Sequence, residues 1–265
     1  MSRYNKPGKS PIKFVLLMLT VVGLTYAFKD SILSASHKVA NAEPLVNEKA
    51  IREIIRSEIN TYFEEDPEVV INAIKRYQEN EMDKQSAEAN TAIAKRMSEL
   101  QDPKNFPFYG NKDAKNVIVQ FFDYNCGFCL KSAVALKAYM AKHKDTKMIL
   151  IDFPVMGDGS LALGAVAASV FKLKPEVYSD FYFKLMDEGV RTVESAKNIA
   201  VGLGINKDQL EEVLKSTYPD TYLARARSMG MDFKVQGTPF IIINGKVFNQ
   251  SLDMDSIENF IKSNN

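Results

Sequence analysis

Apolar side chains recur at every third or fourth position from residue 43 to residue 100, with charged residues between them. This spacing is typical of amphipathic helices. The first stripe consists of Ile51, Ile54, Ile55, Ile59 and Tyr62. Asp66-Pro67 then offers an N-cap and a first-turn proline for a second helix. A third helix is predicted from Glu81 to Leu100.

The apolar stripes of these three predicted helices are thin, so the helices bury little surface on their own. Two arrangements would cover them, namely packing on the main domain or pairing with another copy of the chain. We favour pairing. Residues 43–100 are therefore predicted to be a helical segment that makes the protein a homo-oligomer.

The pattern changes after residues 101–115, which are rich in turn formers and are predicted to be a linker. Residues 116–122 and 147–153 are apolar and β-branched, as in buried strands, and residues 126–143 between them have helical periodicity. A strand, a helix and a strand in this order predict a parallel pair joined by a right-handed crossover.

A helical block is predicted over residues 158–233, with breaks at Gly, Pro and Asn. Two short strands follow around Asn244-Gly245, which is a strong hairpin signal. A helix over residues 257–262 closes the chain. The sequence therefore predicts an α/β domain over residues 116–265, preceded by an all-α segment.

The N-terminus has the pattern of an export signal. Four basic residues and no acid precede the apolar run Phe14–Phe28, which is shorter than the ~20 residues that span a bilayer. Ala40-Asn41-Ala42 offers a cleavage site. Residues 1–42 are predicted to be a signal peptide or an uncleaved signal anchor, and a buried core helix is the third alternative. Either membrane interpretation places the remainder outside the cytoplasm, in the periplasm.

Composition and charge exclude some classes of protein. The chain is 46% apolar and 25% charged, as expected of a globular protein, and its net charge is +1. This charge gives no electrostatic support for nucleic-acid binding, so no nucleic-acid partner is predicted.

Cys126 and Cys129 are the only cysteines of the chain. A C-x-x-C pair can bind a metal, form a structural disulfide or exchange electrons. The loop between the two is too short for a disulfide to stabilise the fold much. A structural zinc site needs four ligands, and the chain offers only His37 and His143 besides the cysteines. No metal and no cofactor are therefore predicted, although copper(I) binding by two thiolates stays open as an alternative.

The predicted position of the pair favours redox chemistry. If the helix begins at or just after Cys126, its sulfur faces unpaired backbone N–H groups and the positive end of the helix dipole, which favour the thiolate over the thiol. Cys129 lies one turn further in and is expected to be more buried. An exposed nucleophile with a resolving partner is the arrangement that thiol–disulfide exchange needs.

The segments "FFDYNCGFC" and "GTPFIIINGKVF", together with the order of elements, resemble the DsbA family of thioredoxin-fold oxidoreductases. The resemblance runs from about Phe108 to the C-terminus. It implies a thioredoxin fold with a helical insertion, acting on protein thiols and disulfides with a membrane redox partner. Cys126 would attack and Cys129 resolve. Pro239 would be cis and face the disulfide, and Thr238 would lend its backbone to the substrate.

The helical region before the domain is similar to N-terminal extensions that form dimers or trimers in some members of this family.

Two features depart from the family pattern. Many relatives carry a buried acid where this chain has Gln120, and the strongest oxidants have Pro-His where this chain has Gly127-Phe128. A milder thiolate and a less oxidising couple are expected. Tyr124 and Phe128 are candidate substrate contacts.

Three functions follow from the sequence. The first is an exported oxidoreductase that forms disulfides in substrate proteins. The second is an isomerase or reductase kept reduced by a membrane partner. The third, of another class, is a non-enzymatic envelope chaperone or a copper(I)-binding protein.

Overall fold

The computed structural model describes residues 23–26, 28–33, 47–187 and 192–264. The chain divides into two compact units, Met1–Ile74 and Lys75–Asn265. Most of the predicted export signal lies outside the described residues. Among the residues that are described, no helix combines the length and the apolar character needed to cross a membrane.

Two helices occupy the region for which the sequence predicted three. Helix α2 (Glu48–Glu65) is capped by Asn47, whose side chain accepts from two backbone N–H groups of the first turn. Helix α3 runs without a break from Glu68 to Gln101. The predicted start of a third helix at Glu81 is therefore wrong. Residues 68–80 contain neither Gly nor Pro, so the helix has no local reason to end before Glu81.

The last part of α3 packs on the domain that follows it. Ala89, Ile93 and Leu100 are buried in the core. The Asn90 side chain accepts a hydrogen bond of 2.8 Å from the backbone N–H of Val247. Packing on the main domain, the alternative that we did not favour, thus holds for this part of the helix.

A five-stranded sheet in the order β1-β3-β2-β4-β5 forms the centre of the unit Lys75–Asn265. Strands β2 (Asn116–Phe122) and β3 (Thr146–Asp152) are parallel, with α4 (Gly127–Lys142) as the crossover, which confirms the predicted strand–helix–strand unit. All residues of β3 are buried. Strand β1 (Phe108–Gly110) pairs with β3 in antiparallel fashion and lies inside the predicted linker.

The predicted hairpin is confirmed. Strands β4 (Phe240–Ile243) and β5 (Lys246–Val247) pair in antiparallel fashion across Asn244-Gly245. Both turn residues have positive φ, 48° and 82°, a conformation that Asn and Gly adopt more readily than other residues. The Asn244 side chain also accepts from the backbone N–H of Val117, which ties the hairpin to β2.

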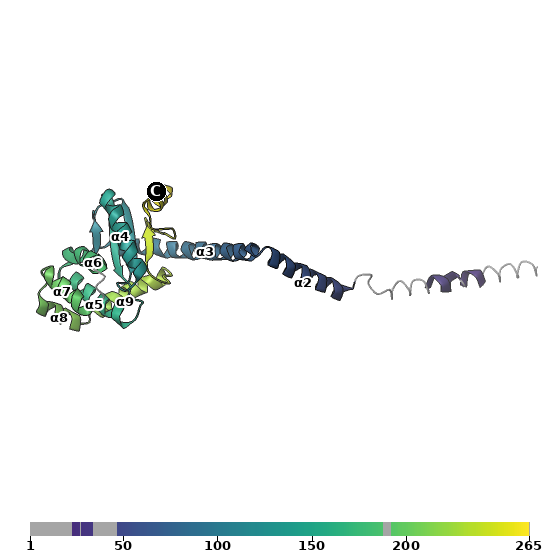
Figure 1. Cartoon of the computed structure of the whole chain (residues 1–265), viewed down its shortest axis with the longest axis horizontal. Coiled ribbons are helices and arrows are strands. Elements are labelled where there is room, and N and C mark those ends of the chain that lie inside the picture. Colours follow the sequence, from purple (N-terminus) through teal and green to yellow (C-terminus); the bar gives the residue numbers. More distant parts are fainter. Residues whose placement is uncertain (1–22, 27, 34–46, 188–191, 265) are drawn as a thin grey trace, which may run out of the picture. The chain divides into compact units, whose positions relative to one another are not determined.

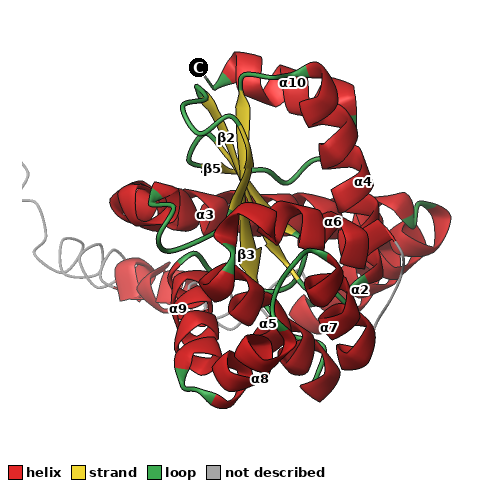
Figure 2. Cartoon of the chain, turned by 90° about the vertical axis from the view of Figure 1, so that its left-hand side faces the viewer, coloured by secondary structure: helices red, strands yellow, loops and turns green. Residues whose placement is uncertain are grey.

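A block of helices fills the segment between β3 and β4 and confirms the predicted helical insertion. It consists of α5 (Asp158–Leu173), the short 3-10 turn η1 (Pro175–Val177), α6 (Tyr178–Asp187), α7 (Val193–Gly202), α8 (Lys207–Lys215) and α9 (Tyr218–Asp232). Helices α6 to α9 all pack against α5 (Figures 1 and 2). Helix α5 has more buried residues than any of the other four. Helix α10 (Met254–Ser263) ends the fold.

Candidate active site

Cys126 is the N-cap residue of α4. Its backbone is extended (φ −82°, ψ 114°), and its sulfur accepts a hydrogen bond of 3.3 Å from the backbone N–H of Cys129. This position confirms the prediction that the helix begins at or just after the first cysteine. The Cys126 side chain is less exposed than expected, because only 5% of its surface is accessible.

Cys129 lies one turn into α4 and is fully buried. Burial raises the pKa of the Cys129 thiol well above its usual range, because desolvation disfavours the thiolate. Both residues are free cysteines. The two sulfurs are therefore chemically unequal. One receives a backbone hydrogen bond at the helix start, and the other is held as a thiol in the core.

The peptide bond between Thr238 and Pro239 is cis, as the resemblance implied. The carbonyl oxygen of Thr238 lies 3.3 Å from the Cys126 sulfur and accepts a hydrogen bond from its thiol. Two segments more than a hundred residues apart thus meet at the reactive sulfur. The backbone around Thr238 is next to any group that would bond to Cys126.

Phe128 and Tyr124 occupy different environments. The Phe128 side chain is 71% exposed beside the cysteine pair, and the ammonium of Lys131 lies 5.7 Å from the centre of its ring. Tyr124, by contrast, is buried, and its ring packs edge-on against Phe122. This burial corrects the prediction that Tyr124 contacts the substrate, because a substrate does not reach a ring inside the core.

Asp123 organises the turn before Cys126. One of its carboxylate oxygens accepts from Asn125 N–H and from the Ser160 hydroxyl, and the other accepts from Val155 N–H and Met156 N–H. The first of these hydrogen bonds lies within the turn, and the other three join the turn to the start of α5 and the residues just before it. The sequence placed Asp123 on the turn but gave no sign of these distant partners.

Gln120 lies fully buried beneath α4. Its amide nitrogen donates to the Ser132 hydroxyl at 2.7 Å, and its amide oxygen accepts from the Tyr182 hydroxyl at 2.8 Å. Ser132 in turn donates to the carbonyl oxygen of Cys129. The amide therefore connects β2 to the turn of α4 that carries Cys129, without supplying an ionisable group.

A second buried acid, Asp152, was not predicted from the sequence. It receives hydrogen bonds from the hydroxyls of Tyr178 (2.5 Å) and Tyr222 (2.9 Å), and the Tyr124 hydroxyl lies 3.4 Å from that of Tyr178. Burial raises the pKa of Asp152 to about 7, although both hydrogen bonds oppose this shift. Its only signal in the sequence is an acid at the end of the apolar run "KMILID".

The histidine within the described residues lies away from the cysteine pair. His143 is the C-cap residue of α4, at the opposite end of the helix from Cys126. Its ring stacks on Tyr139, and its Nε2 is 3.2 Å from a carboxylate oxygen of Glu258. The site thus consists of two thiols, a cis-proline turn and hydrogen bonds from α4.

Comparison with known proteins places this geometry in a family. The sequence profile of the family described as thioredoxin matches residues 101–263, which includes the C-x-x-C pair and the cis-proline turn. The chain belongs to the thioredoxin family. Within it, the chain is a DsbA-type thiol–disulfide oxidoreductase, which confirms the resemblance drawn from its two motifs.

Three relatives illustrate the match. Disulfide bond formation protein D of Bacillus subtilis is 25% identical over 172 residues, or 60% of this chain and 77% of that protein. The thiol–disulfide exchange protein α-DsbA2 of Wolbachia pipientis is 25% identical, with a TM-score of 0.59 over 67% of this chain and 96% of its own. BcfH of Salmonella enterica Typhimurium shares the fold at 20% identity, with a TM-score of 0.64 over 80% and 95% of the two chains.

Proposed function

We propose that this protein is exported and forms disulfide bonds in substrate proteins by exchange at Cys126 and Cys129. The observation that carries the proposal is the position of the Cys126 sulfur. It lies between the first turn of α4 and the Thr238 carbonyl, with the buried Cys129 behind it.

The reaction begins with the oxidised pair. A substrate thiolate attacks the Cys126 sulfur, the Cys126–Cys129 bond breaks, and Cys129 takes the electron pair. Because the pKa of Cys129 is raised, its sulfur then takes a proton and becomes a thiol. The product is a mixed disulfide between the substrate and Cys126.

A second thiolate of the substrate then attacks the substrate sulfur of the mixed disulfide. Cys126 leaves as a thiolate, whose charge is stabilised by the N–H of Cys129. The substrate has lost two electrons and the enzyme has gained them. A membrane redox partner is proposed to take these electrons and restore the disulfide.

Isomerase or reductase activity is the second candidate. It is favoured by Gln120, which offers no proton-accepting carboxylate beneath α4, and by Phe128, which places no cation next to Cys126. Both features favour a couple that is less oxidising than the strongest oxidants. In this mode reduced Cys126 attacks an incorrect disulfide of the substrate.

A redox titration of the purified protein against glutathione separates the candidates. A potential of about −120 to −180 mV supports the oxidase. A more reducing value, together with rescue of a scrambled disulfide protein, supports the isomerase. A protein that forms no mixed disulfide with glutathione contradicts both, and copper(I) binding by the thiolates would then be measured. The matched control is a variant with both cysteines replaced by serine.

Export is proposed from the N-terminal sequence and is tested separately. Fractionation of cells that express the full chain should place it outside the cytoplasm, and N-terminal sequencing should show whether residues 1–42 are removed. Recovery of the chain in the cytoplasm would contradict export but would leave the exchange chemistry untouched.

A further inference from the structure

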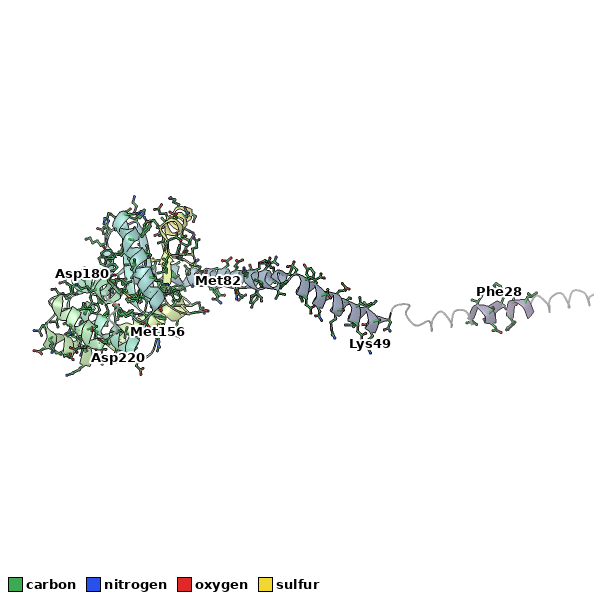
Figure 3. All side chains as sticks on the ribbon, viewed as in Figure 1. Phe28, Lys49, Met82, Met156, Asp180 and Asp220 are labelled. Carbon is green, nitrogen blue, oxygen red and sulfur yellow. The ribbon has the colours of Figure 1, made fainter. Side chains whose placement is uncertain are left out.

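A cavity of about 630 Å³ lies between the last turns of α3, the start of β2 and the β4–β5 hairpin, within the unit Lys75–Asn265. Asn90 is the first α3 residue of its lining, and Figure 3 labels Met82 on the same helix, eight residues earlier. Sites for small molecules usually have volumes of roughly 300–1,000 Å³, so the cavity is large enough for one.

The cavity is separate from the exchange site. Lys115 and Val117 line it at the start of β2, whereas Cys126 follows the end of the same strand. Strand β2 has seven residues, so its two ends are about 20 Å apart. A molecule in this cavity is therefore not the substrate segment that bonds to Cys126.

Most side-chain acceptors of the lining are already engaged by the protein. The lining includes four side-chain amides, and three of their oxygens accept hydrogen bonds: Asn90 from Val247 N–H at 2.8 Å, Asn244 from Val117 N–H at 2.9 Å, and Asn264 from the Lys246 ammonium at 2.8 Å. These bonds fix the orientation of the three amides. Little acceptor capacity is left for a ligand that donates hydrogen bonds.

Donors, by contrast, are left over. Within the described part of the chain, neither the Nδ2 of Asn90 nor the ammonium of Lys115 has an acceptor. The Lys246 ammonium uses one of its three N–H groups on Asn264. None of the described residues that line the cavity is an acid. Two ammonium groups and a free amide donor favour a ligand that is negatively charged and rich in acceptor oxygens.

We propose that this cavity binds a small organic anion that carries carboxylate or phosphate groups. Lys115 and Lys246 balance its charge, and the Nδ2 of Asn90 donates to one of its oxygens. Met97 and Val117 provide apolar surface for its carbon skeleton. The inference is independent of the exchange function, because neither cysteine takes part in the binding.

Calorimetric titration of the full-length protein tests the site with three probes. Citrate carries carboxylates, glucose 6-phosphate carries a phosphate, and glucose is the neutral control of similar size. We expect at least one anion to bind with a stoichiometry of one per chain, while glucose does not bind. The anion that binds more tightly identifies the preferred acid group. Binding of neither anion, or equal binding of glucose, would overturn the proposal.

Asn90→Asp tests the assignment of the donor. It keeps the oxygen that accepts from Val247 N–H and replaces the free donor with a carboxylate oxygen, which repels the anion. We expect the affinity to fall at least tenfold. Asn198→Asp is the matched control, because Asn198 is an exposed residue of α7 that does not line the cavity. Equal losses in the two variants would assign the effect to net charge and overturn the site.

The two lysines provide a test that leaves the hydrogen bond between Asn90 and Val247 intact. Lys115→Gln and Lys246→Gln should each weaken anion binding about threefold, because both side chains are exposed and their charges are screened by solvent. Lys207→Gln, at the start of α8, should leave the affinity unchanged. An affinity that neither cavity variant lowers would place the anion elsewhere and contradict the proposal.

Discussion

The Cys126 thiol donates a hydrogen bond to the Thr238 carbonyl oxygen over 3.3 Å, while its sulfur accepts from the N–H of Cys129 over the same distance. These two contacts respond differently to ionisation. A thiolate keeps the contact with the N–H and strengthens it, but it has no proton to donate to the carbonyl oxygen. Loss of the proton therefore frees the Thr238 carbonyl to accept from a substrate backbone.

Because the Cys126 and Cys129 sulfurs have different environments, replacing one or the other with alanine should have different effects. Cys126→Ala should abolish exchange with a dithiol peptide, because the buried Cys129 is inaccessible and is held as a thiol. Cys129→Ala should instead accumulate mixed disulfides at Cys126, since no internal thiol releases the substrate. Mass spectrometry of each variant after incubation with a peptide disulfide measures the mixed disulfide and distinguishes the two variants. Exchange that persists in Cys126→Ala would rule out the mechanism.

Gln120→Glu should make stability fall with rising pH more steeply than it does in the wild-type protein. Burial raises the pKa of a carboxyl at this fully buried position above the unfolded value of about 4.3. A raised folded pKa means that the free energy of unfolding falls as pH rises from about 4 towards that pKa. We expect this carboxyl to add a loss of about 3 kcal/mol at pH 8 relative to pH 5, beyond the loss of the wild-type protein. Urea unfolding measures it.

Gln120→Met is the matched control, because it has a similar volume and no ionisable group. It loses the hydrogen bonds to Ser132 and Tyr182, and its destabilisation should therefore be the same at both pH values. If Gln120→Glu behaved like Gln120→Met across this range, the glutamate would not be titrating in the core.

Asp152→Asn should remove a pH dependence that the wild-type protein has. The pKa of Asp152 is raised to about 7 by burial, against 3.8 for an ordinary aspartate. The folded protein therefore binds the proton more tightly, and stability falls between about pH 4 and pH 7. The total loss is roughly 4 kcal/mol, at about 1.4 kcal/mol per pKa unit. Urea unfolding of both proteins at pH 4.5 and 8 measures the difference.

Tyr178→Phe offers a second check on the same cluster. It removes a hydrogen bond of 2.5 Å that favours the ionised carboxylate, so it should raise the pKa of Asp152 further. The pH-dependent loss should extend to higher pH in this variant. Curves for wild type and Asp152→Asn that run parallel across the range would contradict a titrating Asp152.

Local sequence signals accounted for the regular elements and for the reactive pair. The apolar run at 116–122 and the turn Asn244-Gly245 each determine their structure through nearby residues, and β2 has the predicted bounds. Cys126 at the helix start followed from the same kind of signal. Strand β1 was missed because its three residues lie among turn formers and are ordered by pairing with β3.

The parts of the site that were missed depend on contacts between distant residues. Asp123 reads as a turn residue in the sequence, yet its partners Val155, Met156 and Ser160 lie more than 30 positions away. Asp152 is ordinary in sequence and exceptional only because two tyrosines from the helical block enclose it. Such clusters need the whole chain to be folded before they exist.

Phe128→His should make the redox couple more oxidising. The Phe128 side chain lies exposed beside the cysteine pair, so an imidazolium there would stabilise the Cys126 thiolate of the reduced form. A gain of about 1 kcal/mol corresponds to about 20 mV towards positive values. A glutathione titration at pH 6 measures the potential. Phe128→Leu, which adds no charge, is the control, and an equal shift in both variants would contradict the electrostatic cause.

The exposed apolar side chains of α2 lead to a prediction about assembly. Every residue of this helix is exposed, including Ile51, Ile54, Ile55, Ile59 and Tyr62. Burying one isoleucine contributes about 1.5–3 kcal/mol, so a stripe of this length stabilises a pair of copies if each covers the other. We therefore propose that α2 binds α2 of a second copy.

Ile55→Asp should convert the oligomer into a monomer, because it places a charge in the apolar contact, where it loses its hydration. Light scattering during gel filtration measures the mass of the purified protein at micromolar concentration. Asn60→Asp is the matched control, since it adds the same charge, and helical spacing places residue 60 on the polar side of α2. Its mass should equal that of the wild type. A monomeric wild-type protein would exclude this interface, and equal effects of the two variants would assign the change to net charge rather than to the stripe.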